Sequence, residues 1–145
     1  MIRPTFDTFN EKWASRLLGL KPTRGIDGYL GIVVTEFEAG RLVAQMEVTD
    51  ELITGMKTMH GGCLSAMCDH VLGVVMYPVM PPGYWAATTE FKINLLAPVT
   101  TGVCTATSEI VAMTKRMSVV RIQIENEDRL VALAQGTCTI VAPKQ

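Results

Sequence analysis

Histidine and cysteine are both scarce in this chain. Its 145 residues include only two histidines, His60 and His70, and four cysteines. No cysteine pair has CxxC spacing, so the sequence predicts no zinc site of standard spacing and no other metal site. Cys63 and Cys68 lie five residues apart and thus on different faces of one predicted helix, which disfavours a disulfide between them. We therefore expect reduced, buried thiols, as is usual in the cytoplasm.

An excess of basic charge is also missing. Lysine and arginine number 13 against 14 aspartates and glutamates, and the formal net charge is −1. Binding to nucleic acid needs a basic stripe that this chain lacks, so we expect no nucleic-acid partner. The N-terminus has no apolar core typical of a signal peptide, and no apolar run approaches the length needed to span a bilayer. These absences predict a cytoplasmic protein with no membrane partner.

Apolar residues are abundant instead. They make up 48% of the chain, whereas charged residues make up 19%. The mean hydropathy of +0.26 is high for a soluble monomer of this size. It indicates that some apolar surface is buried between subunits. The length predicts one domain with a single hydrophobic core.

The hydrophobic periodicity predicts two helices and six strands. Residues 5–20 and 61–77 have apolar side chains at helical spacing, and Pro78 ends the second helix. Two strands are expected within residues 25–50, and four more follow in a meander at 84–98, 102–114, 116–126 and 129–142. We therefore expect an α+β fold in which an antiparallel sheet wraps one long central apolar helix, with an extra N-terminal helix.

The 61–77 helix is apolar on nearly every side, which is typical of a buried helix. Asp69 stands in its middle, where aspartate is unfavourable and cannot act as an N-cap. Gly62, Ala66, Asp69 and Gly73 share one stripe, and three of the four are small, so another backbone, a second helix or a ligand can approach closely. A buried carboxylate must be hydrogen-bonded or ion-paired, be protonated, or take part in catalysis. Asp69 is therefore either a hydrogen-bonded packing residue or a catalytic carboxylate.

The sequence His60-Gly61-Gly62 opens this helix and favours the catalytic alternative. Two glycines allow a ligand to approach the backbone, and free N–H groups point outward at the positive end of the helix dipole. Such a helix start can stabilise a developing oxyanion. The alternative is an ordinary glycine-assisted turn in which His60 is a polar cap. A carboxylate two turns further along makes the whole pattern more specific than the turn alone.

The stretch HGGCLSAMCDHVLG, residues 60–73, resembles the signature of hotdog-fold acyl-CoA thioesterases of the phenylacetate-pathway (PaaI-like) type. As in that family, a carboxylate stands nine residues after the histidine. The resemblance includes TTEFKINLLAPV, residues 88–99. It implies one hotdog domain over residues 1–145, with a helical extension at 1–24 and a core at 25–142. It also implies a homodimer or homotetramer with its sites at the dimer interface.

The resemblance assigns roles to the residues of the helix start. Asp69 would be the nucleophile or the general base, and the N–H of Gly61 would hold the thioester oxygen. His60 and Gly62 would shape the turn. The implied reaction is hydrolysis of an acyl-CoA thioester to a free acid and CoA, without a metal or a cofactor, since CoA is part of the substrate.

Further binding residues are implied by the same resemblance. The family often has an amide residue six positions before the histidine, where this chain has Thr54. A hydroxyl from the partner subunit corresponds best to Thr88, whereas Thr89 is one register away, and alternation lets only one of them face the site. Candidates for holding the CoA nucleotide are Lys92, Lys115 and Arg116.

Two other functions remain open at this stage. The first is an enoyl-thioester hydratase, because the hotdog fold supports that chemistry too, although it normally uses a histidine and a carboxylate from different subunits. The second is a non-catalytic acyl-CoA binding protein, which Thr54 in place of an amide keeps possible. The acyl group is expected to be medium-chain or aryl.

Overall fold

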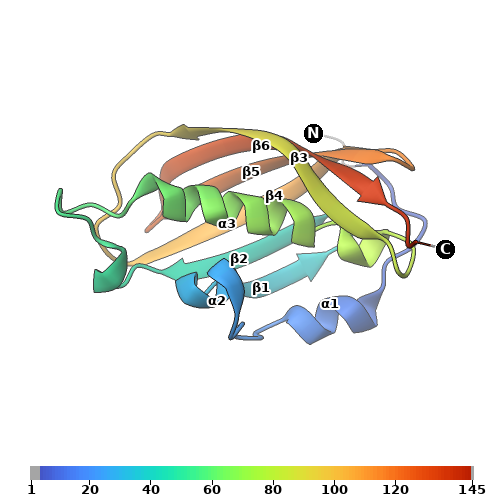
Figure 1. Cartoon of the computed structure of the whole chain (residues 1–145), viewed down its shortest axis with the longest axis horizontal. Helices are drawn as coiled ribbons and strands as arrows, with labels where there is room; N and C mark the ends of the chain where they lie inside the picture. Colours follow the sequence, from blue (N-terminus) through green and yellow to red (C-terminus); the bar gives the residue numbers. More distant parts are fainter. Residues whose placement is uncertain (1–3, 145) are drawn as a thin grey trace.

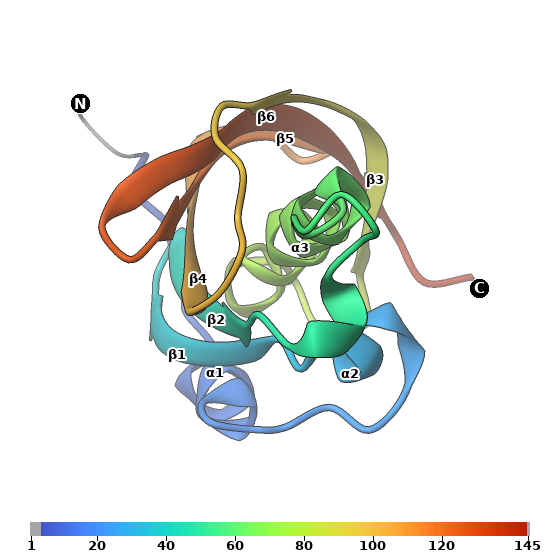
Figure 2. The ribbon, with the colours of Figure 1, turned by 90° about the vertical axis from the view of Figure 1, so that its left-hand side faces the viewer.

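The structure, a computed structural model, describes residues 4–144; residues 1–3 and 145, the ends of the predicted domain, lie outside the described residues. A six-stranded antiparallel sheet curves around helix α3 (Figures 1 and 2). The helices are α1 (Glu11–Leu17), α2 (Gly25–Leu30) and α3 (Gly61–Val74), with 3₁₀ turns η1 (Asp50–Leu52) and η2 (Tyr77–Val79). The strands are β1 (Val33–Glu38), β2 (Arg41–Glu47), β3 (Trp85–Leu95), β4 (Val103–Met113), β5 (Met117–Asn126) and β6 (Arg129–Val141). The predicted α+β sheet around one central helix is confirmed.

The strand order in the sheet is β1-β2-β4-β5-β6-β3. Strands β4 to β6 form a meander as predicted, and the tight turn between β5 and β6 places Glu127 and Asp128 at positive φ. The prediction that β3 belongs to the same meander was wrong, because β3 pairs with β6 instead of β4. Residues 96–102 separate β3 from β4, a connection long enough to pass from one side of the sheet to the other. Strand β3 therefore forms one edge of the sheet.

The N-terminal helix is shorter than predicted. Only Glu11–Leu17 is helical, within the predicted 5–20. Asn10 caps this helix by accepting a hydrogen bond from the N–H of Trp13 at 3.0 Å. The ring of Phe6 lies against Gly40 in the turn between β1 and β2, in the space that a Cβ on that glycine would need. Phe6 thus packs on the sheet instead of continuing the helix.

Helix α2 was not predicted, because residues 25–50 were interpreted as two strands. It is only six residues long and has glycines at two of its positions, so it shows no helical periodicity in the sequence. Gly31 ends it at φ 64°, and the next residue, Ile32, donates to the carbonyl of Asp27 at 3.0 Å. This helix packs beside α3 and brings Asp27 to the face of α3 that the sheet leaves open.

The core-facing side of α3 packs on the concave face of the sheet. Its fully or almost fully buried side chains are Leu64, Met67, Cys68, Val71 and Leu72. Burial of each such aliphatic side chain contributes about 1.5–3 kcal/mol to folding. The Ser108 hydroxyl of β4 donates to the carbonyl of Val71 at 3.1 Å, which fixes α3 against the sheet at this point.

The sequence-based expectation that no apolar run could span a bilayer was wrong in one respect. By length and composition alone, Gly61–Val79 is long and apolar enough to span a bilayer, with a mean hydropathy of 1.3. Half of this segment is buried inside the structure. Its apolar residues face the sheet, which is the environment of a core helix.

All four cysteines are free thiols, as predicted. Cys63 is half-buried and the others are buried. Burial raises the pKa of Cys68 to about 12, and the nearby Asp69 carboxylate adds to this effect. Burial likewise raises the pKa of Cys104 to about 11. These thiols therefore stay protonated at neutral pH, so their thiolate forms are scarce.

Gly136 in β6 allows α3 to approach the sheet closely. A Cβ at this position would clash with Leu72 of α3 and would lie 2.7 Å from the carbonyl oxygen of Glu90 on the neighbouring strand. Gly136→Ala is expected to lower the free energy of unfolding by about 3 kcal/mol through overpacking, measured by urea denaturation. Gly55→Ala is the control, because a Cβ there would meet nothing within 4 Å. This substitution is expected to change the free energy of unfolding by less than about 0.5 kcal/mol. Equal stability of the two variants would contradict this account of the contact.

Candidate active site

The stripe of small residues predicted on α3 lies on the side of the helix that the sheet does not cover. Gly62 and Asp69 are exposed, and Ala66 and Gly73 are half-buried. A Cβ on Gly73 would meet no atom within 4 Å. The expectation that Asp69 is buried was therefore wrong for the single chain. The sheet curves around one side of α3 only, and Figure 1 shows the helix in front of strands β4 and β5.

The Asp69 carboxylate makes no hydrogen bond and no ion pair within residues 4–144. The hydrogen-bonded packing role therefore has no donor in the described chain, and the catalytic role of Asp69 stays a prediction. The pKa of Cys138 in β6 is raised to about 11. Burial is the main cause, a hydrogen bond with Thr88 opposes it, and the negative charge of Asp69 adds to it. Asp69 and Thr88 are thus both close to the Cys138 thiol.

Thr88 and Thr89 lie on opposite faces of β3. Thr88 pairs with Cys138, whose side chain is fully buried against α3, so Thr88 is on the helix side. The Thr89 hydroxyl lies 2.7 Å from that of Thr139, on the other side of the sheet. A bulge follows Thr88, so that Glu90 pairs with the next residue of β6. The resemblance placed the hydroxyl on the partner subunit, and this assignment stays a prediction.

The start of α3 presents one free N–H group. Nδ1 of His60 accepts a hydrogen bond from the N–H of Gly62 at 2.8 Å. In a neutral imidazole this arrangement places the ring proton on Nε2. The N–H of Gly61, the first residue of the helix, donates to no acceptor in the described part of the chain. His60 therefore caps the helix through Gly62 and leaves Gly61 as the available donor.

Gly61 borders a shallow apolar cavity of about 260 Å³, which we call the Gly61 cavity. The other lining residues are Met59, Leu64, Leu95, Leu96, Ala97 and Pro98. A Cβ on Gly61 would overlap the end of the Leu95 side chain. Leu95 and Leu96 could not be placed here from the sequence, because only the pairing of β3 at the sheet edge brings them beside the helix start.

The Thr54 hydroxyl is hydrogen-bonded within a turn. Its hydroxyl donates to the carbonyl of Thr58 at 2.9 Å and accepts from the N–H of Met56 at 3.2 Å. The Lys57 backbone in this turn has φ 63°. The hydroxyl therefore closes the loop before His60, and the substrate contact implied by the resemblance stays a prediction.

His70, the residue after Asp69, is half-buried. Burial lowers the pKa of its imidazole, and the carboxylates of Asp27 and Asp69 oppose this shift. The ring is therefore neutral at pH 7. Asp27 was not anticipated, because its helix α2 was not. No cluster of three or more histidine, cysteine, aspartate or glutamate residues suited to a metal occurs within residues 4–144.

The free N–H of Gly61 and the carboxylate of Asp69 are too far apart to act on one carbonyl group within a single chain. Eight residues of α-helix separate them, which corresponds to about 12 Å along the axis. A nucleophile and an oxyanion donor must each lie about 3 Å from the reacting carbonyl. One chain therefore presents two half-sites on the open face of α3.

Comparison with known proteins identifies the class to which this geometry belongs. A sequence profile of the Thioesterase superfamily matches residues 56–133, which include all of α3. The chain belongs to that superfamily. It is therefore a thioester hydrolase, and the predictions of a hotdog fold and of an enzyme are confirmed.

Individual relatives of this thioesterase cover most of its length. It is 30% identical over 109 residues to the acyl-coenzyme A thioesterase PaaI of Escherichia coli, covering 74% of this chain and 76% of that protein. It is 28% identical over 122 residues to the 1,4-dihydroxy-2-naphthoyl-CoA hydrolase of Listeria monocytogenes, covering 83% of this chain and 98% of that one. A solved structure of a phenylacetic acid degradation-related protein from Ralstonia eutropha has a TM-score of 0.79 at 24% identity, covering 88% of this chain and 98% of the other.

Proposed function

We propose that this thioesterase hydrolyses acyl-CoA to a free acid and CoA, as a PaaI-like enzyme with Asp69 as its nucleophile or general base. The observation that carries the proposal is the pair of unsatisfied groups on one open helix face. One is the Asp69 carboxylate, and the other is the N–H of Gly61. The names of the Escherichia coli and Listeria relatives, both acting on CoA thioesters, support CoA as the leaving group.

We propose further that the reaction takes place between two copies of the chain. If two α3 helices lie antiparallel, with Gly61 of one opposite Asp69 of the other, the two-fold axis passes beside Ser65, the midpoint between them. The hydroxyl of Ser65 donates to the carbonyl of Gly61 at 3.1 Å, so no unsatisfied polar group blocks this contact. The small side chains of the stripe allow the two helices to approach closely.

The free edge of β3 supports the same arrangement. Strand β3 is 11 residues long and pairs only with β6 in the described chain. Trp85 and Leu95 on this strand are each 53% exposed. A long edge strand with exposed apolar side chains is a common site of association. A second copy at this edge would cover the open face of α3 at the same time.

The proposed chemistry needs only groups of the protein and water. The thioester oxygen accepts a hydrogen bond from the N–H of Gly61, at the positive end of the α3 dipole. The Asp69 carboxylate attacks the carbonyl carbon, or removes a proton from a water that does so, and the C–S bond breaks. When Asp69 acts as the general base, it passes the proton of that water to the CoA thiolate and is restored as a carboxylate; when it acts as the nucleophile, the thiolate takes a proton from water. If an acyl-Asp69 anhydride forms, a second water hydrolyses it and restores the carboxylate.

The test is thiol release by the wild-type protein from short, medium, long and aryl acyl-CoAs. We expect release with medium-chain or aryl substrates, and the aryl-CoA in the name of the Listeria relative supports including that class. Acyl-CoA binding without thiol release would instead support the non-catalytic binding protein. Hydration of an enoyl-CoA, followed by its ultraviolet absorbance, would support the hydratase.

A further inference from the structure

The Cys138 thiol is a buried polar group to which the reaction proposed above gives no role. The buried side chains of β6 are Val131, Ala132, Ala134, Cys138 and Ile140. Cys138 is the one among them that can donate and accept a hydrogen bond, although sulfur does both weakly. A buried group of this kind normally has hydrogen-bond partners, and those of Cys138 lie on two different elements.

The first partner of the thiol is the carbonyl of Leu72 on α3. The thiol donates to this oxygen, with 3.8 Å between sulfur and oxygen. In a regular α-helix the N–H of Met76 would reach the Leu72 carbonyl, but here it donates to the carbonyl of Gly73 at 3.2 Å. The last turn of α3 therefore leaves the Leu72 oxygen to the thiol, whose proton points at the helix.

The second partner is the hydroxyl of Thr88 on β3. Thr88 and Cys138 are directly opposite each other in the antiparallel pair of β3 and β6, so their Cβ atoms lie about 5 Å apart on one face of the sheet. Burial raises the pKa of the thiol, and the hydrogen bond with Thr88 opposes that rise. A bond with this effect is donated to the sulfur. The Thr88 hydroxyl therefore donates, and the sulfur accepts.

These contacts lie beside Asp69. Asp69 and Leu72 are three residues apart on α3 and are therefore neighbours on one face of the helix. Asp69 and Thr88 are both exposed in the single chain, whereas Cys138 is fully buried. The carboxylate and the hydroxyl thus lie on the solvent side of the thiol.

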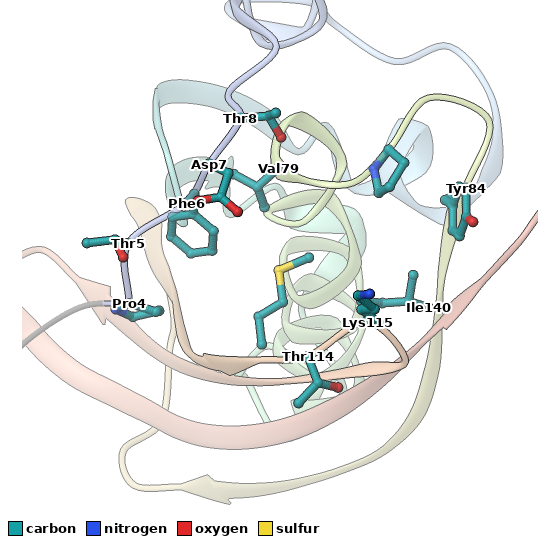
Figure 3. Close-up of a pocket in the computed structure, with 12 residues that line it drawn as sticks. Pro4, Thr5, Phe6, Asp7, Thr8, Val79, Tyr84, Thr114, Lys115 and Ile140 are labelled. Carbon is teal, nitrogen blue, oxygen red and sulfur yellow. The ribbon is translucent and has the colours of Figure 1, made fainter.

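The thiol is closed off at the far end of α3. The large cavity there has a volume of about 700 Å³ and is lined by Ile140, two residues beyond Cys138 on β6 (Figure 3). Cys138 itself does not line this cavity. Thr88 is therefore the link between the buried sulfur and the open face of α3.

The contact with sulfur determines how the Thr88 hydroxyl can act on that open face. A hydroxyl has one proton and two lone pairs. Because its proton is given to Cys138, Thr88 can only accept a hydrogen bond from a group on the open face. The attacking water has two protons, of which one goes to Asp69 and the other can be held by Thr88. This arrangement directs a lone pair of the water oxygen toward the carbonyl carbon.

We propose that Cys138 is a positioning residue for the attacking water, acting through Thr88 of the same chain as Asp69. The hydrogen bonds run in one direction, from the water to Thr88, from Thr88 to Cys138, and from Cys138 to the Leu72 carbonyl. Without the sulfur, the Thr88 hydroxyl can rotate and donate to Asp69 or to the water, and the orientation of the water is lost. This inference rests on the proposed function and names a residue that supports its chemical step.

The first test replaces Cys138 by alanine and by serine. Cys138→Ala removes both contacts and is expected to lower kcat about fivefold with KM unchanged, because only the water loses its orientation. Cys138→Ser keeps a donor and an acceptor at this position and should restore most of kcat. Cys104→Ala is the matched control. Cys104 is equally buried but lies on β4, which pairs with neither β3 nor β6, so this variant should keep wild-type kcat.

A purely structural role of Cys138 predicts a different order of activities. Alanine would then be tolerated at least as well as serine, whose hydroxyl is costly to bury without partners. A double-mutant cycle adds a second criterion. In a Thr88→Val background, Cys138→Ala should cause no further loss of kcat, because the hydroxyl that the sulfur orients is already absent. Additive losses, or a serine variant no better than alanine, would contradict the inference.

Infrared spectroscopy of the thiol gives a readout without turnover. The S–H stretching band of Cys138 is isolated as the difference between wild type and Cys138→Ser. Thr88→Val removes the donor to the sulfur and is expected to shift this band. Thr89→Val is the matched control and should leave the band in place, because the Thr89 hydroxyl lies beside that of Thr139 on the other side of the sheet. A band that does not respond to Thr88→Val would overturn the inference.

The outcomes distinguish this inference from the proposed function. If Asp69→Asn is inactive and Cys138→Ala is as active as wild type, the inference fails and the proposed function stands. If wild type releases no thiol from any acyl-CoA, the proposed function fails and the inference fails with it, even where the infrared band shifts.

Discussion

Replacing Asp69 by asparagine is expected to lower kcat for acyl-CoA hydrolysis by about a thousandfold or more. An amide has nearly the shape of the carboxylate but can neither attack the carbonyl nor accept the proton of a water. KM should change little, because Asp69 is assigned to the chemical step and not to binding. Stopped-flow or continuous thiol release, measured for both proteins at saturating substrate, gives the ratio.

The same substitution is expected to leave the fold intact. The Asp69 side chain is exposed in the single chain and makes no hydrogen bond or ion pair in its described residues, so no folded-state contact is lost. Asp27→Asn is the matched control. It removes the other carboxylate that faces His70 but has no role in the proposed reaction, so it should retain most of kcat. Near-normal turnover by Asp69→Asn would remove this residue from the mechanism.

The parts of the fold that depend on local sequence could be predicted. The apolar surface of α3, the His60-Gly61-Gly62 start and the alternation along β5 each reflect contacts close in the chain. The central helix and the four strands with predicted bounds, at 84–98, 102–114, 116–126 and 129–142, therefore lie near those bounds. The resemblance favoured Thr88, and alternation allows only one of Thr88 and Thr89 to face the helix. The pairing of Thr88 with Cys138 does put it on the helix side.

The parts that depend on distant contacts could not be predicted. Phe6 has helical spacing with Phe9 and Trp13, yet its ring packs on Gly40, more than thirty residues away in the chain. Strand β3 pairs with β6 because residues 96–102 carry the chain across the sheet, and no local pattern encodes that choice. The exposure of Asp69 has a similar origin. An apolar helix predicts burial, but the sequence does not say which side the sheet leaves open.

A substitution at Gly61, at the start of α3, is also expected to have a large effect on kcat. Proline is well tolerated at the first position of a helix, and His60 already has φ −61° and ψ 133°, which suit a residue before proline. Gly61→Pro therefore removes the N–H assigned to the thioester oxygen and keeps the helix. We expect kcat to fall about a hundredfold or more, as for the loss of an oxyanion donor.

Gly61→Ala is the matched control for this proline variant. Both substitutions add a Cβ that must displace the end of the Leu95 side chain, but only alanine keeps the N–H. Alanine should therefore retain most of kcat, with any change confined to KM through the Gly61 cavity. Similar losses in the two variants would show that the Leu95 contact, and not the hydrogen bond, explains the effect.

Mixing the two inactive chains decides whether the half-sites belong to different copies. In a dimer of one Gly61→Pro chain and one Asp69→Asn chain, one site combines both substitutions. The other combines the intact Gly61 of one copy with the intact Asp69 of the other. After random reassociation of equal amounts, about one quarter of wild-type activity should return, since half the dimers are mixed and each has one intact site. If both groups acted within one chain, the mixture would stay as inactive as its parents, and the distance of about 12 Å along α3 would need another explanation.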